Sequence, residues 1–396
     1  MVPEWAPNVH PIIVHFPIAL LILAVMADLL SLLWRQQWLQ WAATGLYLVG
    51  AVAGLAAFVS GREAAESVLL PTAANRVLTD HADWALWTIW AYGVLALVRT
   101  VFVWRKQVLA IPIHLAFFCM GVAGMYFLYQ TGDHGAQLVY QYGVGVAAVD
   151  QSGGSRHDHG DHSVSRAETG RKLEGKAHIA DDNVRVVSDY EQLGGAMHME
   201  AESIDKHQQL NDDLRVGTNG DWHWIIGPES PRVLREQFTW LQGDWLDLMP
   251  AIYRDGEKEK LLLHSSPEGV LFVREEAMAD IQVDLRIRPV KFSGSLAIVH
   301  HVQDVDSYHF LEVKGQSLKL GKVYGGATEI FDEGVVAEST WMDIRLVSDG
   351  THLRGYINGK MVVHGHAPQP APGRVGLRLE GAGLVLLNAL HVEQIQ

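Results

Sequence analysis

The chain has 396 residues and a formal net charge of −14, from 31 Lys and Arg against 45 Asp and Glu. This acidic balance argues against nucleic-acid binding, which needs a positively charged surface. The one cysteine, Cys119, excludes an internal disulfide, a thiolate zinc site and a covalent C-x-x-C-H haem attachment. Any haem in this protein would therefore lack a thioether link to the chain.

The N-terminal part contains four apolar segments without Asp, Glu, Lys or Arg. With its flanks, each segment supplies the ~20 residues that a helix needs to cross ~30 Å of hydrocarbon. The sequence therefore predicts four transmembrane helices, near residues 11–34, 41–60, 84–104 and 109–130.

The basic residues of the short loops indicate the orientation of these helices. They gather at Arg35 and at Arg99, Arg105 and Lys106, whereas residues 1–9 contain neither Lys nor Arg. By the positive-inside rule these loops face the cytoplasm, so the N-terminus, the 61–83 loop and everything after residue 131 lie outside. Arg62 and Arg76 in the 61–83 loop argue against this orientation. The first segment lacks a basic n-region, so we expect it to remain as a helix instead of being cleaved as a signal peptide.

On this topology four histidines lie at the outer end of the helices. His10 and His15 begin the first helix, His81 precedes the third and His134 follows the fourth. Imidazoles from different helices near one level can ligate a haem iron or a small metal site, and neutral imidazole binds iron, copper or zinc. The alternative for His10 and His134 is an interfacial role, with the polar tip in headgroup water. His15 lies deeper, where an ionisable residue is a functional candidate.

A second polar group is predicted toward the cytoplasmic side. Asp28, Arg99 and His114 lie at a similar depth on three different helices. An unpaired charge there would cost several kcal/mol, so we expect an ion pair between Asp28 and Arg99 with His114 nearby. This group is either a structural clasp or a proton or electron relay. Gly50 and Gly54 form a small-xxx-small pattern typical of close helix packing.

The composition changes after Asp150. Residues 149–184 are predicted to be a flexible linker, because the polar, glycine-rich stretch at 151–162 cannot form a core. Its histidines, His157, His159 and His162, alternate with carboxylates and could form a weak site for zinc, copper or nickel. The alternative is a polar tether without a ligand.

Residues 185–396 are predicted to form an all-β sandwich, because short alternating runs are separated by turn signals. Asn358–Gly359 is a good candidate for a two-residue hairpin turn. The predicted strands are residues 260–263, 270–274, 281–288, 296–301, 310–313, 341–347, 353–357, 361–363 and 375–379.

A glycoside hydrolase needs two carboxylates at a defined separation across a groove. No spaced pair stands out among the candidates, which we interpret as solvated turn and edge residues: Asp304, Asp306, Glu312, Asp332, Glu333 and Asp343. Several aromatic side chains could stack on sugars or belong to the core, and the core interpretation is favoured. These are Trp222, Trp224, Trp240, Trp245 and Tyr308.

The N-terminal part resembles a bacterial four-helix membrane family, domain of unknown function 2231, over residues 1–148. The motifs are His10-Pro-Ile-Ile-Val-His-Phe-Pro-Ile-Ala-Leu20, Asp28-Leu-Leu30, the histidine before the third helix, Arg99 and Gln137-Leu-Val-Tyr-Gln-Tyr-Gly-Val-Gly-Val146. The family is often fused to cytochrome-like or other exported domains. The resemblance therefore implies membrane redox work, with His10, His15 and His81 as ligands of haem b or a metal.

The C-terminal part resembles the concanavalin A-like sandwich of the 3-keto-disaccharide hydrolase type, domain of unknown function 1080, over residues 235–396. The matching segments are framework strands and turns, among them Asp306-Ser-Tyr-His-Phe-Leu-Glu-Val313, Trp341-Met-Asp-Ile-Arg-Leu346 and Gly355-Tyr-Ile-Asn-Gly-Lys360. The resemblance implies a jelly-roll fold. Where relatives have phenylalanine and arginine before the aspartate turn, this chain has Val299-His-His301, which puts inherited substrate contacts in doubt.

Together these patterns predict a four-helix transmembrane domain at 1–148, a linker at 149–184 and a periplasmic β-sandwich at 185–396 in a bacterial inner membrane. The leading function is a redox-type module that binds haem b or a transition metal and carries a periplasmic binding domain. Its expected partners are the lipid bilayer, a redox or membrane-complex partner and a glycan. The alternatives are a membrane-anchored carbohydrate-binding or glycoside-hydrolysing protein and a non-catalytic assembly subunit.

Overall fold

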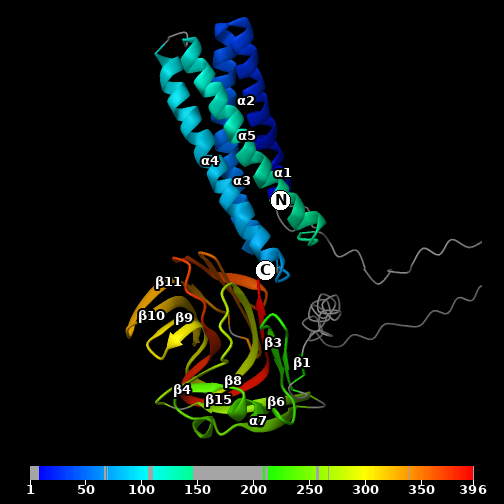
Figure 1. The fold of residues 1–396 in the computed structure, drawn as a ribbon, viewed down its shortest axis with the longest axis vertical. Helices are drawn as coiled ribbons and strands as arrows, with labels where there is room; N and C mark the ends of the chain where they lie inside the picture. Colours follow the sequence, from blue (N-terminus) through cyan, green and yellow to red (C-terminus); the bar gives the residue numbers. More distant parts are fainter. Residues whose placement is uncertain are drawn as a thin grey trace, which may run out of the picture. The chain divides into compact units, whose positions relative to one another are not determined.

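The computed structural model describes a set of long helices followed by an antiparallel β domain (Figure 1). The described residues are 9–66, 68, 70–105, 110–145, 208–209, 213–255, 258–265, 267–337 and 339–395. The predicted linker, with His157, His159 and His162, lies outside them.

The helices are α1 (His10–Ile13), α2 (His15–Trp34), α3 (Gln37–Glu66), α4 (Ala74–Trp104) and α5 (Ile111–Tyr140). Four segments, α1 with α2 and each of the other three, are long and apolar enough to cross a membrane. The sequence placed the four segments correctly but made three of them too short.

The parts of the helices that the sequence did not predict are their polar ends. Helix α4 begins at Ala74 where the sequence predicts residue 84, and α5 ends at Tyr140 where it predicts residue 130. The charges of Asp80, Asp83 and Asp133 end the apolar runs, yet a carboxylate does not break a helix whose backbone hydrogen bonds continue. His81 and His134, expected just outside helices, therefore lie inside α4 and α5.

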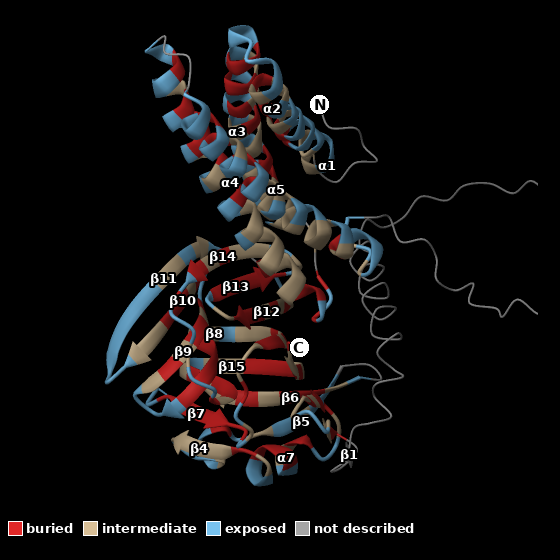
Figure 2. Cartoon of the chain, turned by 45° about the horizontal axis from the view of Figure 1, so that its top comes forward, coloured by how far each residue is buried: buried red, intermediate tan, exposed pale blue. Residues whose placement is uncertain are grey.

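Many residues of the bundle helices are exposed, pale blue in Figure 2, and large apolar side chains are common among them. Phe16, Trp87 and Leu97 are 63%, 61% and 66% exposed, which suits contact with lipid and not with water. Trp34, Trp38 and Trp104 are exposed at the helix ends beside Arg35 and Arg105. Tryptophan with arginine at one level is typical of a membrane interface.

Inside the bundle the helices pack around two tyrosines. The Tyr47 and Tyr92 rings are buried and stack with centroids 6.0 Å apart. A Cβ atom on Gly50 would lie 2.7 Å from Leu21 Cδ2, and one on Gly124 would lie 2.8 Å from Tyr92 Cζ. Gly50 therefore serves close packing, as predicted, whereas a Cβ on Gly54 would have only ordinary contacts.

All described strand pairs of the β domain are antiparallel. The domain also contains the short helix α7 (Ser230–Glu236) and the 3-10 helix η2 (Trp245–Leu248). The strands are β1 (Gln208–Gln209), β2 (Leu214–Val216), β3 (Trp222–Ile225), β4 (Thr239–Gln242), β5 (Ala251–Asp255), β6 (Lys258–Ser265), β7 (Val270–Val273), β8 (Ile281–Asp304), β9 (Ser307–Lys314), β10 (Ser317–Tyr324), β11 (Ala327–Val335), β12 (Met342–Asp349), β13 (His352–Ile357), β14 (Lys360–His366) and β15 (Arg374–Gln394).

Two long strands, β8 and β15, pair along almost their whole length and belong to both layers of the sandwich. In one layer the order is β1, β2, β3, β15, β8, β12, β13 and β14. In the other layer β7 and β9 flank the remaining halves of β15 and β8, followed by β4 and by β10 and β11. The predicted strands at 281–288 and 296–301 are therefore one strand, and 375–379 is only the first part of β15.

Glycines allow this central pair to bend between the layers. The pairing shifts register between Ala382 and Leu384, next to Gly381 and Gly383, which have φ angles of 129° and 120°. A side chain at Gly383 would collide with the Lys291 carbonyl of β8. Only glycine adopts this backbone at low cost, so the bend depends on the sequence at these positions.

The space between the two layers contains one large apolar core. Its members include the fully buried Trp222 and Trp224 and side chains from β8, β12 and β15. The predicted fold class, a helical membrane bundle followed by an all-β sandwich, is confirmed. The described part of the β domain begins with residues 208–209 and continues from residue 213. The predicted start at residue 185 lies outside the described part of the chain.

Candidate functional site

Three of the four outer histidines lie on separate helices, and the structure brings two of them, His10 and His81, into ring contact. His10 lies in α1, His81 in α4 and His134 in α5. The His10 and His81 rings meet edge to face, with centroids 6.5 Å apart and planes at 85°. Two glycines make room for them: a Cβ on Gly61 would lie 2.9 Å from the His10 ring and one on Gly135 would lie 3.1 Å from the His81 ring.

The three imidazoles share one hydrogen-bonding pattern. The Nδ1 atom of His10 donates to the Ala57 carbonyl at 3.0 Å, and it also lies 3.1 Å from Ser60 Oγ. His81 Nδ1 donates to the Thr131 carbonyl at 2.9 Å, and His134 Nδ1 donates to the carbonyl of Gln130 at 2.7 Å. A carbonyl oxygen can only accept, so each neutral ring carries its proton on Nδ1 and its lone pair on Nε2.

His15 has a different position. Its side chain is exposed on α2, next to the exposed Phe16. Within the described part of the chain it makes no hydrogen bond or ring contact with His10, His81 or His134. The structure therefore does not bring His15 into contact with the other three, and its role as a ligand stays a prediction.

The second predicted group, Asp28, Arg99 and His114, forms a buried network. Arg99 Nη1 and Nη2 donate to the two carboxylate oxygens of Asp28 at 2.9 and 2.6 Å, and His114 Nε2 lies 2.7 Å from Asp28 Oδ1. Arg99 Nε donates to Thr44 Oγ1 at 2.9 Å. The Asp28 and Arg99 side chains are 0% exposed, so this bidentate pair is enclosed on all sides.

Aromatic rings complete the surroundings of Arg99. Its guanidinium carbon lies 5.7 Å from the Tyr47 ring centroid and 5.6 Å from that of Phe117. The three guanidinium nitrogens and the Asp28 carboxylate all have partners, so the arrangement offers a rigid connection among α2, α3, α4 and α5 and no open ligand position.

Three of the five aromatic side chains that could stack on sugars or belong to the core are buried in the described β domain. Trp222, Trp224 and Tyr308 are buried, so the core interpretation holds for them. A depression of about 410 Å³ on the described surface is lined by small, polar and aliphatic residues without an aromatic ring or carboxylate. These are Pro289, Gly315, Gln316, Val336, Ala337, Ser339, Thr340 and Met342.

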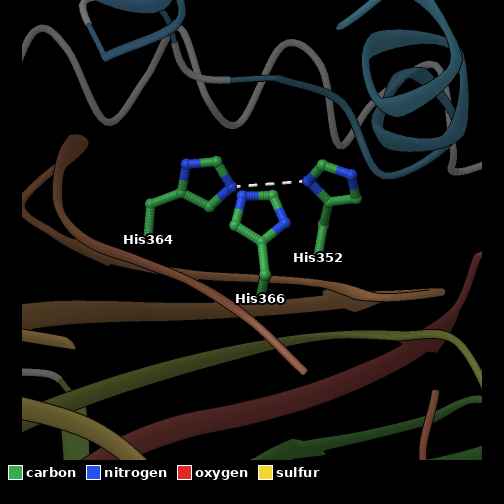
Figure 3. A group of neighbouring side chains, drawn as sticks. All are labelled: His352, His364 and His366. Carbon is green, nitrogen blue, oxygen red and sulfur yellow. Dashed lines mark hydrogen bonds between the residues drawn. The ribbon is translucent and has the colours of Figure 1, made fainter. Parts of the chain in front are cut away.

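The structure also assembles three histidines that the sequence interpretation did not select. His352 lies on β13, and His364 and His366 lie on β14 (Figure 3). One ring nitrogen from each lies within 4.8 Å of the others. His352 is paired directly with His366, and Arg354 is paired with His364. The His-Gly-His spacing puts both β14 rings on one face of the strand, a signal that the sequence contains.

A second histidine group is buried in the other half of the β domain. His300 and His301 have ring centroids 4.8 Å apart, and His309 lies 5.5 Å from His300. Burial, followed by the charges of His301 and His309, holds the pKa of His300 well below its usual value. Burial also lowers the pKa of His309 to about 4, with His301 and Lys322 acting in the same direction. These rings are therefore neutral in the folded protein at pH 7.

One family model matches the N-terminal part of the chain. The family model described as predicted membrane protein (DUF2231) matches residues 6–148, which confirms the N-terminal resemblance. No curated protein matches the chain.

Solved structures resemble the β domain only distantly. Carbohydrate-binding module CBM66 from Bacillus subtilis shares 16% identity with a TM-score of 0.32, covering 39% of this chain and 93% of that chain. A Bacillus subtilis protein of unknown function with a galectin-like fold shares 14% identity with a TM-score of 0.33, covering 41% and 93%. A Bacillus licheniformis β-glucanase shares 10% identity with a TM-score of 0.32, covering 45% and 99%. With TM-scores below 0.5 these likenesses carry no argument about ligand or activity.

Proposed function

We propose that this membrane protein is a redox module that holds haem b iron, or another transition metal, between His10 and His81 with His134 beside them. The observation that carries the proposal is the shared Nδ1 pattern. Metal-bound histidines almost always donate their second ring nitrogen to a carbonyl or carboxylate, which orients the ring and strengthens the ligand nitrogen. Here all three rings are oriented in this way by the backbone of α3 or α5.

The spacing of His10 and His81 fits a shared ion. Their ring centroids are 6.5 Å apart, and metal–nitrogen bonds to imidazole are about 2 Å long. Haem iron or another transition metal held by these two residues would supply one-electron transfer. The chain's own contribution is to hold the two rings on separate helices at a fixed distance.

The buried Asp28–Arg99 pair has a structural role in this proposal. It ties α2 to α4 at another level of the bundle and resists changes in helix register. We further propose that the histidine end of the bundle and the β domain face the periplasm of a bacterial inner membrane, since more basic residues (Arg35, Arg105 and Lys106) lie at the opposite helix ends than at this one (Arg62 and Arg76).

The test is a visible spectrum of the full-length, detergent-purified protein, oxidised and dithionite-reduced, with metal analysis of the same sample. Expression must supply haem. We expect reduced α and Soret bands of a b-type haem, or a bound transition metal at a fixed stoichiometry. His81→Ala and His10→Ala should remove the cofactor.

His15→Ala is the matched control, because this histidine begins the same apolar segment but is exposed. It should keep the cofactor and its spectrum. A colourless, metal-free wild type, or a His81→Ala variant with undiminished cofactor, would contradict the proposed site.

A further inference from the structure

The histidine group on β13 and β14 has the spacing of a metal-ion site. His352 Nδ1 and His364 Nε2 lie 3.4 Å apart (Figure 3). Two nitrogens that each lie 2.0–2.1 Å from a tetrahedral ion are about 3.3–3.4 Å apart. The nitrogen of His366 lies within 4.8 Å of both, and in Figure 3 its ring lies between the other two. A small rotation of this exposed ring would complete the triangle of ligands.

A carboxylate orients the first of these rings. His352 Nε2 lies 3.3 Å from Asp83 Oδ1 of helix α4. The carboxylate can only accept, so Nε2 carries the proton and the lone pair of His352 is on Nδ1, facing His364. This carboxylate–histidine arrangement is the usual second contact of a metal-bound imidazole.

The neighbouring arginine has partners of its own. Arg354, which is paired with His364, donates to Asn75 Oδ1 at 3.3 Å and to Thr79 Oγ1, so its guanidinium is directed at α4. A transition metal requires imidazoles with available lone pairs, and the contact with Asp83 leaves one on His352 Nδ1.

We propose that His352, His364 and His366 bind one divalent transition-metal ion of the zinc type, with Asp83 as the carboxylate that orients His352. The ion takes three imidazole nitrogens and leaves a fourth position on the side of the exposed His366. Three protein ligands with an open position is the arrangement of catalytic rather than structural zinc sites. The site is separate from the proposed haem or metal site of the bundle and shares no ligand with it.

Helix α4 lies between the two sites. His81 and Asp83 are two residues apart, and a helix rotates by about 200° over two residues, so their side chains leave α4 on opposite faces. His81 contacts His10 and α5, whereas Asp83 contacts His352. The same turn of α4 therefore orients a histidine for the bundle and a carboxylate for the β domain.

The test uses the full-length protein in detergent, stripped of metal, with His157, His159 and His162 replaced by Asn so that the linker cannot bind. Titration with Co²⁺ should give the intense visible absorption of a four-coordinate ion and a stoichiometry of one, and Zn²⁺ should displace it. His366→Ala should weaken Co²⁺ binding at least tenfold while leaving thermal unfolding of the metal-free protein unchanged, because this side chain is exposed. Asp83→Asn should weaken binding by about 10–100-fold.

His264→Ala on β6 is the control for general loss of imidazole, and it should bind Co²⁺ as the parent does. His81→Ala should also bind normally, so failure of the bundle site and failure of this site are distinguishable. Equal Co²⁺ affinity in the His366→Ala and His264→Ala variants, or no binding by the parent protein, would show a hydrogen-bonded histidine group only.

Discussion

The bundle and the β domain place their polar groups in opposite ways. In the bundle, the outer surface is apolar and the charged side chains of Asp28 and Arg99 lie at the centre. In the β domain the centre is an apolar core around Trp222, and most charged side chains are on the surface. Burying a charged side chain therefore has a different free-energy cost in the two regions.

Lipid tails are apolar, so burying apolar side chains inside a bundle gains no further hydrophobic free energy, and the helices are held together by packing and by matched polar contacts. In water the burial of apolar side chains is favourable, so a sandwich is stabilised by its core and tolerates buried histidines only in the neutral form. Four predictions test or sharpen this contrast.

The largest effect is expected at the buried ion pair. Asp28→Ala leaves the Arg99 guanidinium without its carboxylate in a site that is 0% exposed, and it should destabilise the bundle by about 3–5 kcal/mol. Asp28→Ala combined with Arg99→Leu should be less destabilising than the single change. The measurement is unfolding of the detergent-solubilised protein by increasing SDS. A double variant less stable than the single one would rule out the ion pair as the stabilising contact.

The next effect concerns the bend of the sandwich. Gly383→Ala requires a side chain at a φ of 120° against the Lys291 carbonyl, and we expect a loss of about 2–4 kcal/mol. The control is Gly315→Asn, where φ is 58°, a left-handed conformation that Asn tolerates, and no atom lies within 4 Å of a Cβ. Thermal unfolding of the full-length protein measures both. Similar losses at the two positions would mean that the collision at the bend is relieved by local movement.

A smaller effect is expected from helix packing. A Cβ on Gly124 would lie 2.8 Å from the Tyr92 ring, whereas nothing lies within 4 Å of a Cβ on Gly93. Gly124→Ala should therefore cost about 1–3 kcal/mol, and Gly93→Ala should be neutral or slightly stabilising. SDS unfolding compares the two. Equal stability would show that close packing at Tyr92 is dispensable.

The smallest effect is the pH dependence of the β domain. The pKa of His309 falls from 6.5 in the unfolded chain to about 4 in the fold, chiefly through burial and then through His301 and Lys322, with Glu329 opposing. Between these values the unfolded chain binds the proton and the folded chain does not. This part of the stability is therefore complete above pH 6.5 and is lost as the pH falls toward 4.

Melting temperatures between pH 7 and pH 5 test this dependence. His309→Gln should flatten the decline, since glutamine does not titrate. A variant whose melting temperature falls with pH as steeply as that of the parent would exclude His309 as a source of the dependence.

Much of the bundle was predictable because its rules are local. An apolar run of sufficient length predicts a membrane helix whatever its neighbours are, and a constant rise of 1.5 Å per residue predicts that Asp28, Arg99 and His114 share a level. The helix ends were predicted less well, because hydropathy records where lipid contact stops and not where hydrogen bonding stops. The face on which His15 projects depends on how the first helix rotates in the bundle, which its own sequence does not state.

In the β domain the sequence determined the sandwich class and the turn at Asn358–Gly359, since alternation and turn propensity act over a few residues. The tertiary structure decided the histidine group. Regular pairing from that turn would put His352 opposite Gly365, but a bulge between Gly355 and Tyr356 shifts the register by one residue and pairs His352 with His366. A one-residue shift moves a side chain to the other face of a sheet, and whether it occurs depends on contacts across strands, such as Leu311 against Gly355, that no local pattern contains.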